Sequence, residues 1–131
     1  MKLRIRGNSI RLRLGRGEVA NLLENGKVEE ATEFGPGPRF EYALRTSSSV
    51  PGPCASFRDG RIEVLLPTQL ARDWAGGQEV GISTEQLLDL RGEPGSRSLH
   101  LLIEKDFACI KVPANEDQSD AFPHPEGAEC K

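Results

Sequence analysis

Apolar and polar residues alternate with a period of two at the beginning of the chain. The aliphatic positions of this pattern are Leu3, Ile5, Ile10, Leu12 and Leu14. Alternation places these side chains on one face of an extended chain, so it predicts strands at 2–6 and 9–14. Gly7 and Asn8, which lie between the two strands, tolerate positive φ and suit a two-residue hairpin turn.

A two-residue turn determines which residues of this hairpin face one another. Arg4 is expected opposite Arg11, and Lys2 opposite Arg13, which makes one face of the hairpin polar and basic. The other face is wholly aliphatic. A slip of one residue would mix the two faces, so the pattern specifies this register.

A helix and two further strands complete the first half of the chain. Val19, Leu22 and Leu23 have helical spacing, and Gly26 is a typical helix end, so we predict a helix over 16–25. The strands that follow are predicted at 27–34 and 40–46.

The second half repeats this order of elements. Predicted in turn are a hairpin with strands at 55–58 and 61–66 around Asp59-Gly60, a helix that Pro67 opens and Gly76-Gly77 ends, a strand at 79–83, an ambiguous segment at 87–90, a turn at 91–96 and a strand at 98–104. A shift of 52 residues superposes the two hairpins, and a shift of 51 superposes the helices, with Leu23 on Trp74. We interpret this self-similarity as an internal duplication.

The duplication predicts both the fold class and the domain organisation. We expect a mainly β (α+β) protein, a small β-barrel made of two strand-strand-helix-strand-strand repeats with a pseudo-two-fold axis within one chain. The 131 residues should form a single domain, with repeat one at 1–46, a linker at 47–53, repeat two at 54–104 and a C-terminal tail at 105–131. The expected core, with Leu23 and Trp74 in equivalent places, consists of Leu3, Ile5, Ile10, Leu12, Leu14, Ile62, Val64 and Leu66.

Two sequence motifs carry a resemblance to a known family. They are Arg6-Gly7-Asn8-Ser9-Ile10-Arg11-Leu12-Arg13-Leu14 with Gly26-Lys27-Val28-Glu29 after the first helix, and Asp59-Gly60-Arg61-Ile62 with Leu66-Pro67 and Gly77-Gln78-Glu79-Val80. In this order they resemble the AbrB and MazE antitoxin domains, which form a dimeric swapped-hairpin barrel with one copy per chain. Two copies here imply the same barrel within one chain. The whole chain also resembles an uncharacterised family of small bacterial proteins.

The resemblance implies DNA binding through the basic face of the first hairpin. Arg4 and Arg13 fall on basic positions of the antitoxin family, and Ser9 falls on the serine of its loop. The chain departs from the family at Gly15, where a proline is expected. Glu63 lies among the basic residues of the second hairpin, so a two-fold basic surface is not expected.

The charge distribution also favours an anionic partner. The net charge is −3, but the first 16 residues hold six bases and no acid. A β-ribbon of this kind is one way in which proteins contact DNA. The nucleic-acid-binding candidates are Lys2, Arg4, Arg6, Ser9, Arg11 and Arg13.

Two other interpretations of the basic face remain open. In one, it is a solvated face whose charges pair with Glu29, Glu30 and Glu33 on a neighbouring strand. In the other, the protein is a protein-interaction or structural module. Its basic face would then be covered by an acidic protein partner, or by the acidic C-terminal tail with Phe122 as an apolar anchor. We expect a monomer or a weak homodimer.

The remaining sequence features indicate a cytoplasmic protein without enzymatic chemistry. No apolar run is long enough for a membrane span or a secretion signal, so we predict no membrane partner. The cysteines are odd in number and are expected to be reduced thiols. Cys109, His124 and Cys130 are soft metal ligands, but their intervals of 14 and 5 residues contain no Cys-x-x-Cys pair. We therefore predict no metal, no cofactor and a non-enzymatic binding module.

Overall fold

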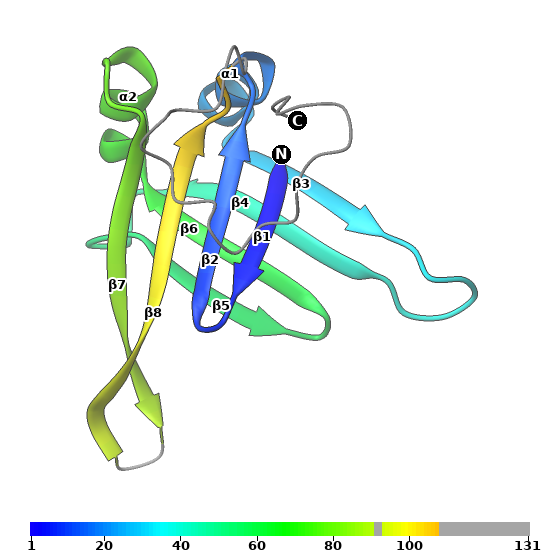
Figure 1. Ribbon diagram of the computed structural model, residues 1–131. Coiled ribbons are helices and arrows are strands. Elements are labelled where there is room, and N and C mark those ends of the chain that lie inside the picture. Colours follow the sequence, from blue (N-terminus) through cyan, green and yellow to red (C-terminus); the bar gives the residue numbers. More distant parts are fainter. Residues whose placement is uncertain (91–92, 108–131) are drawn as a thin grey trace, which may run out of the picture.

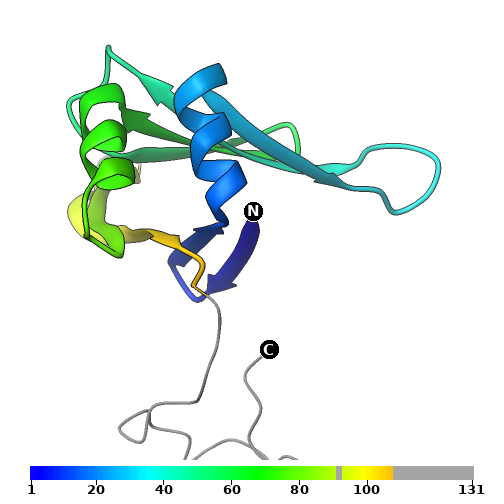
Figure 2. The same ribbon diagram turned by 90° about the horizontal axis from the view of Figure 1, so that it is seen from above.

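The computed structural model describes residues 1–90 and 93–107, and the side chains of 1–88 and 97–107. The elements in chain order are β1 (Lys2–Arg6), β2 (Ser9–Leu14), α1 (Arg16–Asn25), β3 (Lys27–Thr32), β4 (Phe40–Ser47), β5 (Cys54–Arg58), β6 (Arg61–Pro67), α2 (Thr68–Gly76), β7 (Gly81–Leu90) and β8 (Glu93–Lys105). The two helices lie side by side at one end of the strands (Figure 2). Neither of these helices is long and apolar enough to cross a membrane.

The strands form two four-stranded sheets (Figure 1). The first sheet has the order β1-β2-β8-β7, and the second sheet has the order β3-β4-β6-β5. Each sheet joins a hairpin from the first half of the chain to a hairpin from the second half. The joint is a parallel pair, β2 with β8 in the first sheet and β4 with β6 in the second. The predicted mainly β, α+β class is therefore confirmed.

The predicted closed barrel does not form in the described part of the chain, because the hydrogen-bonded ladders stop at β1, β7, β3 and β5. Side chains connect the edges of the two sheets instead. Gln86 of β7 accepts a hydrogen bond from the amide of Ala55 in β5 at 2.7 Å and donates one to its carbonyl at 3.1 Å. On the other side, Glu30 of the edge strand β3 forms an ion pair with the amino group of Met1, at 2.7 Å. The hydroxyl of Tyr42 in the inner strand β4 donates to the carbonyl of Met1 at 3.2 Å.

The hairpins β1–β2 and β5–β6 form as the sequence predicts. In the first hairpin, Arg4 lies opposite Arg11, and every other pair of the predicted register is confirmed. Gly7 has a φ of 53°, which a glycine adopts without strain. In the second hairpin, Asp59 and Gly60 have φ values of 51° and 74°, as a type I′ turn requires.

The last two strands differ from the prediction. The strand predicted at 79–83 begins two residues later, at Gly81, and it continues through the ambiguous segment at 87–90 as one strand, β7. The turn predicted at 91–96 is wrong for its last four positions, because β8 begins at Glu93. Pairing with β7 extends the ladder until Leu90 lies opposite Glu93. β7 and β8 are consecutive strands, so this pairing forms a local hairpin whose ladder extends further into the segment than its turn-forming composition predicts.

The core lies between the inner faces of the two sheets and the helices. Leu12, Leu14, Ile62, Val64 and Leu66 are buried in it as predicted, together with Leu22, Val28, Leu44, Trp74, Ile82 and Ile103. Leu3 and Ile10 pack against it at its edge.

Two core predictions are wrong. Ile5 is 55% exposed, because it lies near the turn of its hairpin, where the sheets leave an open end. Leu23 is 43% exposed whereas Trp74 is fully buried, so the two are not equivalent. The side chain that α1 buries completely is Leu22. Because adjacent helical residues point about 100° apart, only one of the two leucines can face the core.

Candidate nucleic-acid interface

The predicted basic residues come together on the outer face of the first sheet. Lys2, Arg4 and Arg6 of β1 lie beside Arg13, Arg11 and Ser9 of β2, respectively. We call the set Lys2, Arg4, Arg6, Arg11 and Arg13 the basic face. β1 is an edge strand of the sheet in the described part of the chain (Figure 1).

The neighbour of this hairpin is β8. The parallel register places Ser9 beside His100, Arg11 beside Leu102 and Arg13 beside Glu104. The turn is tied to β8 at Asn8, whose Nδ2 donates to the carbonyl of Ser98 and whose carbonyl accepts from the amide of His100. The hairpin is therefore held in one position relative to the sheet.

One carboxylate balances two of the arginines. Glu104 Oε1 lies 3.0 Å from Nε of Arg11 and 3.1 Å from Nε of Arg13, and the Glu104 side chain is only 17% exposed. Like charges opposite each other on a sheet are destabilising, and this shared carboxylate reduces that repulsion. Lys2 pairs with Asp106 at 3.0 Å.

The predicted partners of the basic face were the wrong acids. Glu29 pairs with Lys27 and Arg61, and Glu33 pairs with Arg39, all on or beside the second sheet. Glu30 lies beside the nitrogen of Met1. The prediction failed because β2 pairs with β8, and β3 belongs to the other sheet.

Arg4 and Arg6 have no ion-pair partner among the described side chains. No carboxylate of those side chains lies within 4.0 Å of either guanidinium group. Among the described side chains, the five cations of the basic face thus meet two carboxylates, those of Glu104 and Asp106. Within this part of the chain, the basic face has more cations than carboxylates.

Two hollows lie on the basic face. One of about 230 Å³ is lined by Lys2, Leu3, Arg4, Arg11 and Arg13. The other, of about 240 Å³, is lined by Arg4, Arg6, Ser9, Arg11, His100 and Leu102. Arginine guanidinium groups and a serine hydroxyl are donors that suit a phosphate group.

His100 is a member of this site that the candidate set did not include. Its Nε2 lies 3.2 Å from Oγ of Ser83, and its Nδ1 lies 3.8 Å from Oε1 of Glu85, both on β7. The alternation of His100 with Leu99 and Leu101 does indicate a polar sheet face. Its place beside Ser9 depends on a parallel pairing that local patterns do not reveal.

The outer face of the second sheet has the opposite character. Four bases and four acids form a connected network of ion pairs, namely Lys27, Arg39, Arg45, Arg61, Glu29, Glu33, Glu41 and Glu63. Arg61 is its centre, at 3.0 Å from Glu29 and 3.4 Å from Glu63. Hydrogen bonds from Arg61 and then from Lys27 hold the pKa of Glu29 below its usual range. The pKa of Arg61 is raised, chiefly by its hydrogen bond to Glu29.

The described residues contain no group of three or more potential metal ligands. The soft metal ligands considered above, Cys109, His124 and Cys130, lie outside the described residues, as does the predicted anchor Phe122. Cys54 is a half-buried free thiol in β5. The absence of an enzymatic role and of a cofactor stays a prediction.

The chain was compared with protein families, with curated proteins and with solved structures. A family model described as "Family of unknown function (DUF7009)" matches residues 1–126. No curated protein and no solved structure matches. The family match includes both sheets, both helices and every residue of the basic face.

Proposed function

We propose that this chain, which belongs to the DUF7009 family, is a binding module that contacts the phosphate backbone of nucleic acid through its basic face. The observation that carries the proposal is the pair Arg4 and Arg6. Both belong to an edge strand, both line the hollow of about 240 Å³, and neither has a carboxylate partner among the described side chains.

The charge pattern favours a polyanion as the ligand. Arg4 faces Arg11 across the hairpin, and Glu104 contacts Arg11 from the opposite strand. Arg4 and Arg11 together have one described carboxylate, that of Glu104, and a phosphate beside Arg4 would add a second counter-charge. Arginine binds phosphate through two parallel N–H donors, so the hollows suit phosphate better than a monovalent ion.

The geometry favours contacts to the backbone over contacts to bases. The basic face is the outer surface of a sheet, so its cations meet the outside of a nucleic acid. Phosphate contacts set affinity and carry little sequence information. We therefore expect weak, salt-sensitive binding with a dissociation constant of roughly 10⁻⁴–10⁻⁶ M, as for non-specific DNA binding.

The test is binding of the full chain to a fluorescently labelled DNA duplex over a series of salt concentrations. We expect binding that weakens steeply with salt, and a loss of at least about tenfold in Arg4→Glu and in Arg6→Glu. Arg58→Glu is the matched control, because Arg58 ends β5 as Arg6 ends β1 and is also exposed. No binding by the wild type at low salt, or equal losses in all three variants, would contradict the proposal.

A second candidate is a protein-interaction module, and one observation favours it. An apolar hollow of about 440 Å³ lies at the open end of the sheets, lined in part by Ile5, Phe40 and Phe57. Phe57 is 68% exposed. An acidic protein with an apolar contact residue would match this hollow and the adjoining basic face. Salt-sensitive binding of an acidic polypeptide such as polyglutamate, without any shift of DNA, would favour this alternative.

We also propose that the two halves arose by internal duplication of a swapped-hairpin unit like those of the AbrB and MazE antitoxins. The strands β1, β2, β3 and β4 of the first half correspond in order to β5, β6, β7 and β8 of the second half. If each strand is replaced by its counterpart, the order β1-β2-β8-β7 becomes β5-β6-β4-β3, which is the order of the second sheet read from its other edge. The registers agree as well. Leu12 pairs with Ile103 in the first sheet, and Val64, 52 residues after Leu12, pairs with Leu44 in the second.

The helices support the duplication at the same shift. Leu22 and Trp74 are 52 residues apart, and both are fully buried. Because each sheet needs one hairpin from each half, separately expressed fragments 1–50 and 51–131 should be unfolded alone and should fold when mixed. Independent folding of either fragment would contradict the proposed exchange of hairpins.

A further inference from the structure

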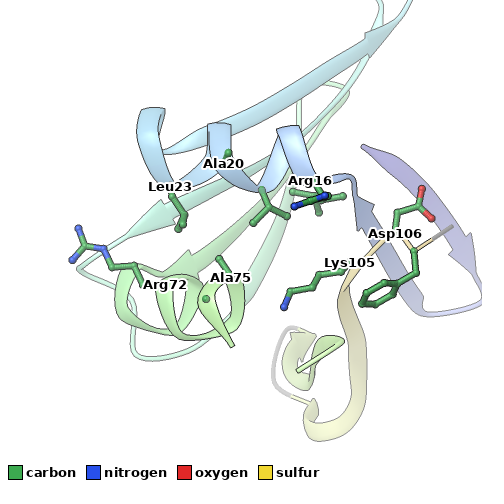
Figure 3. Close-up of a pocket in the computed structure, with 11 residues that line it drawn as sticks. Arg16, Ala20, Leu23, Arg72, Ala75, Lys105 and Asp106 are labelled. Carbon is green, nitrogen blue, oxygen red and sulfur yellow. The ribbon is translucent and has the colours of Figure 1, made fainter. Parts of the chain in front are cut away.

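An apolar groove of about 580 Å³ lies between the two helices and the end of β8. Its walls include Val19, Ala20 and Leu23 from α1 and Ala75 from α2 (Figure 3). The volume lies within the range of roughly 300–1,000 Å³ that is typical of small-molecule sites. Leu23, which is not buried in the core, lines this groove.

Cations stand at both ends of this groove. Arg16 and Lys105 lie at one end, and Arg72 lies at the other (Figure 3). Arg16 and Arg72 form no ion pair with a carboxylate of the described residues. The acid at this site, Asp106, already pairs with Lys2 at 3.0 Å. The groove is therefore apolar along its length and positive at its ends.

The ammonium group of Lys105 is held in position at the groove. Its Nζ donates to the carbonyl of Gly77 at 2.9 Å and lies 5.9 Å from the centre of the Trp74 ring. An ammonium group has three donors, so two remain for another acceptor. Arg16 lines the groove from the start of α1 and Lys105 from the end of β8, so each brings donors to this end of the groove.

We propose that the groove binds an aliphatic carboxylate, with its head group between Arg16 and Lys105 and its chain along Val19, Ala20 and Leu23. A small inorganic anion would leave the aliphatic walls in water, and a neutral hydrocarbon would leave both cations without a counter-charge. A carboxylate on an unbranched chain satisfies both features. This site is separate from the basic face, so it does not depend on nucleic-acid binding.

The test uses the full chain and dodecanoate at concentrations below micelle formation, measured by calorimetry. We expect saturable binding at one site and about fourfold weaker binding for each methylene removed from the chain. Dodecylammonium, which has the same chain and the opposite charge, should bind at least about tenfold more weakly. Equal binding of the two head groups, or no saturable binding, would overturn the proposal.

Variants place the ligand in the groove. Arg16→Glu should weaken dodecanoate binding at least about tenfold, and Arg72→Glu should weaken it less, because Arg72 lies at the chain end. Arg58→Glu is the control with the same change of charge on another surface. Ala20→Trp should fill the groove and abolish binding. Arg16→Glu keeps the test valid if Ala20→Trp does not fold, because Arg16 is exposed at the start of α1.

Other occupants of the groove are further outcomes of the test. Residues 108–131 or a second copy of the chain could fill it instead. A photo-crosslinking residue at position 23 that couples in the wild-type chain to residues 108–131, or to another copy, would overturn the proposal. Protection of position 23 from crosslinking by added dodecanoate, but not by dodecylammonium, would support it.

Discussion

The outer faces of the two sheets have related strand positions but handle charge in different ways. On the second sheet, Arg61 contacts three carboxylates and every base of the network has an acid within 4.0 Å. On the first sheet, two described carboxylates serve five bases, and Arg4 and Arg6 have none. A face that balances its own charge needs no ligand, whereas an unbalanced face of a β-sheet favours an external anion. The anion site that we propose lies on the face whose charges are not balanced among the described residues.

Both sheets bury side chains in the same core, and we expect them to differ only on their outer faces. Leu12 from the first sheet and Leu44 from the second are both almost completely buried. We expect Leu12→Ala and Leu44→Ala each to lower the free energy of unfolding by about 2–5 kcal/mol, because each leaves a cavity. Urea denaturation measures the loss. A nearly unchanged free energy of unfolding in one of the two variants would mean that its sheet contributes little to the stability of the core.

Removal of Glu104 should make the basic face more basic and less stable. Glu104→Ala leaves Arg11 and Arg13 without their shared carboxylate, so we expect a loss of about 1–2 kcal/mol in the free energy of unfolding. DNA binding at low salt should become tighter in the same variant. Glu85→Ala is the control, because Glu85 is more exposed and lies on the neighbouring strand β7. Weaker DNA binding in Glu104→Ala would argue against an anion site here.

Loss of Arg61, the centre of the ion-pair network on the second sheet, should have a smaller effect on stability, and this effect should depend on pH. Arg61→Ala should cost less than about 1 kcal/mol, because the network is largely solvated. The pKa of Glu29 is lowered by Arg61, so this interaction stabilises the fold above the ordinary glutamate pKa and is lost as the pH falls through the folded value. The difference from wild type should therefore disappear in acid.

Two measurements check this prediction. An NMR titration of Glu29 should show its pKa return toward the usual range in Arg61→Ala. DNA binding at neutral pH should stay unchanged, because Arg61 is on the other sheet. A change in DNA binding as large as that of Arg4→Glu would remove the distinction between the two faces.

The smallest expected change in stability is on the basic face itself. Arg4→Ala and Arg6→Ala should alter the free energy of unfolding by no more than about 0.5 kcal/mol, because these side chains are exposed. Each should still reduce the slope of the logarithm of DNA affinity against the logarithm of salt by about one, as expected for one lost phosphate contact. An unchanged slope with normal stability would mean that these arginines do not touch phosphate.

Local structure was predictable from the sequence wherever it depends on neighbouring residues. Alternating aliphatic residues and the Gly7-Asn8 turn specify the first hairpin and its register, and Gly26 marks the end of α1 through its φ of 80°. Helical spacing alone could not decide between Leu22 and Leu23, since both are apolar and adjacent. The core selects Leu22, and the groove between the helices exposes Leu23.

The composition of the site was predictable only in part, because its counter-ions and one neighbouring side chain come from the far end of the sequence. The basic residues themselves are visible in the first 16 positions. Their counter-ion, Glu104, and the neighbouring His100 depend on the parallel pairing of β2 with β8. No local pattern encodes this pairing, so the sequence pointed to Glu29, Glu30 and Glu33 instead.

The same pairing has a consequence for the synthesis of the protein. Asn8 and Ser98, which hold the first hairpin against β8, are 90 residues apart. At roughly 5–20 residues per second, a ribosome needs about 5–20 seconds to make the strand that completes the first sheet. During that interval β2 is an unpaired edge beside a cluster of arginines whose counter-ion, Glu104, has not yet been made. The nascent chain therefore passes through a stage in which it is more cationic and more open to polyanions than the finished protein.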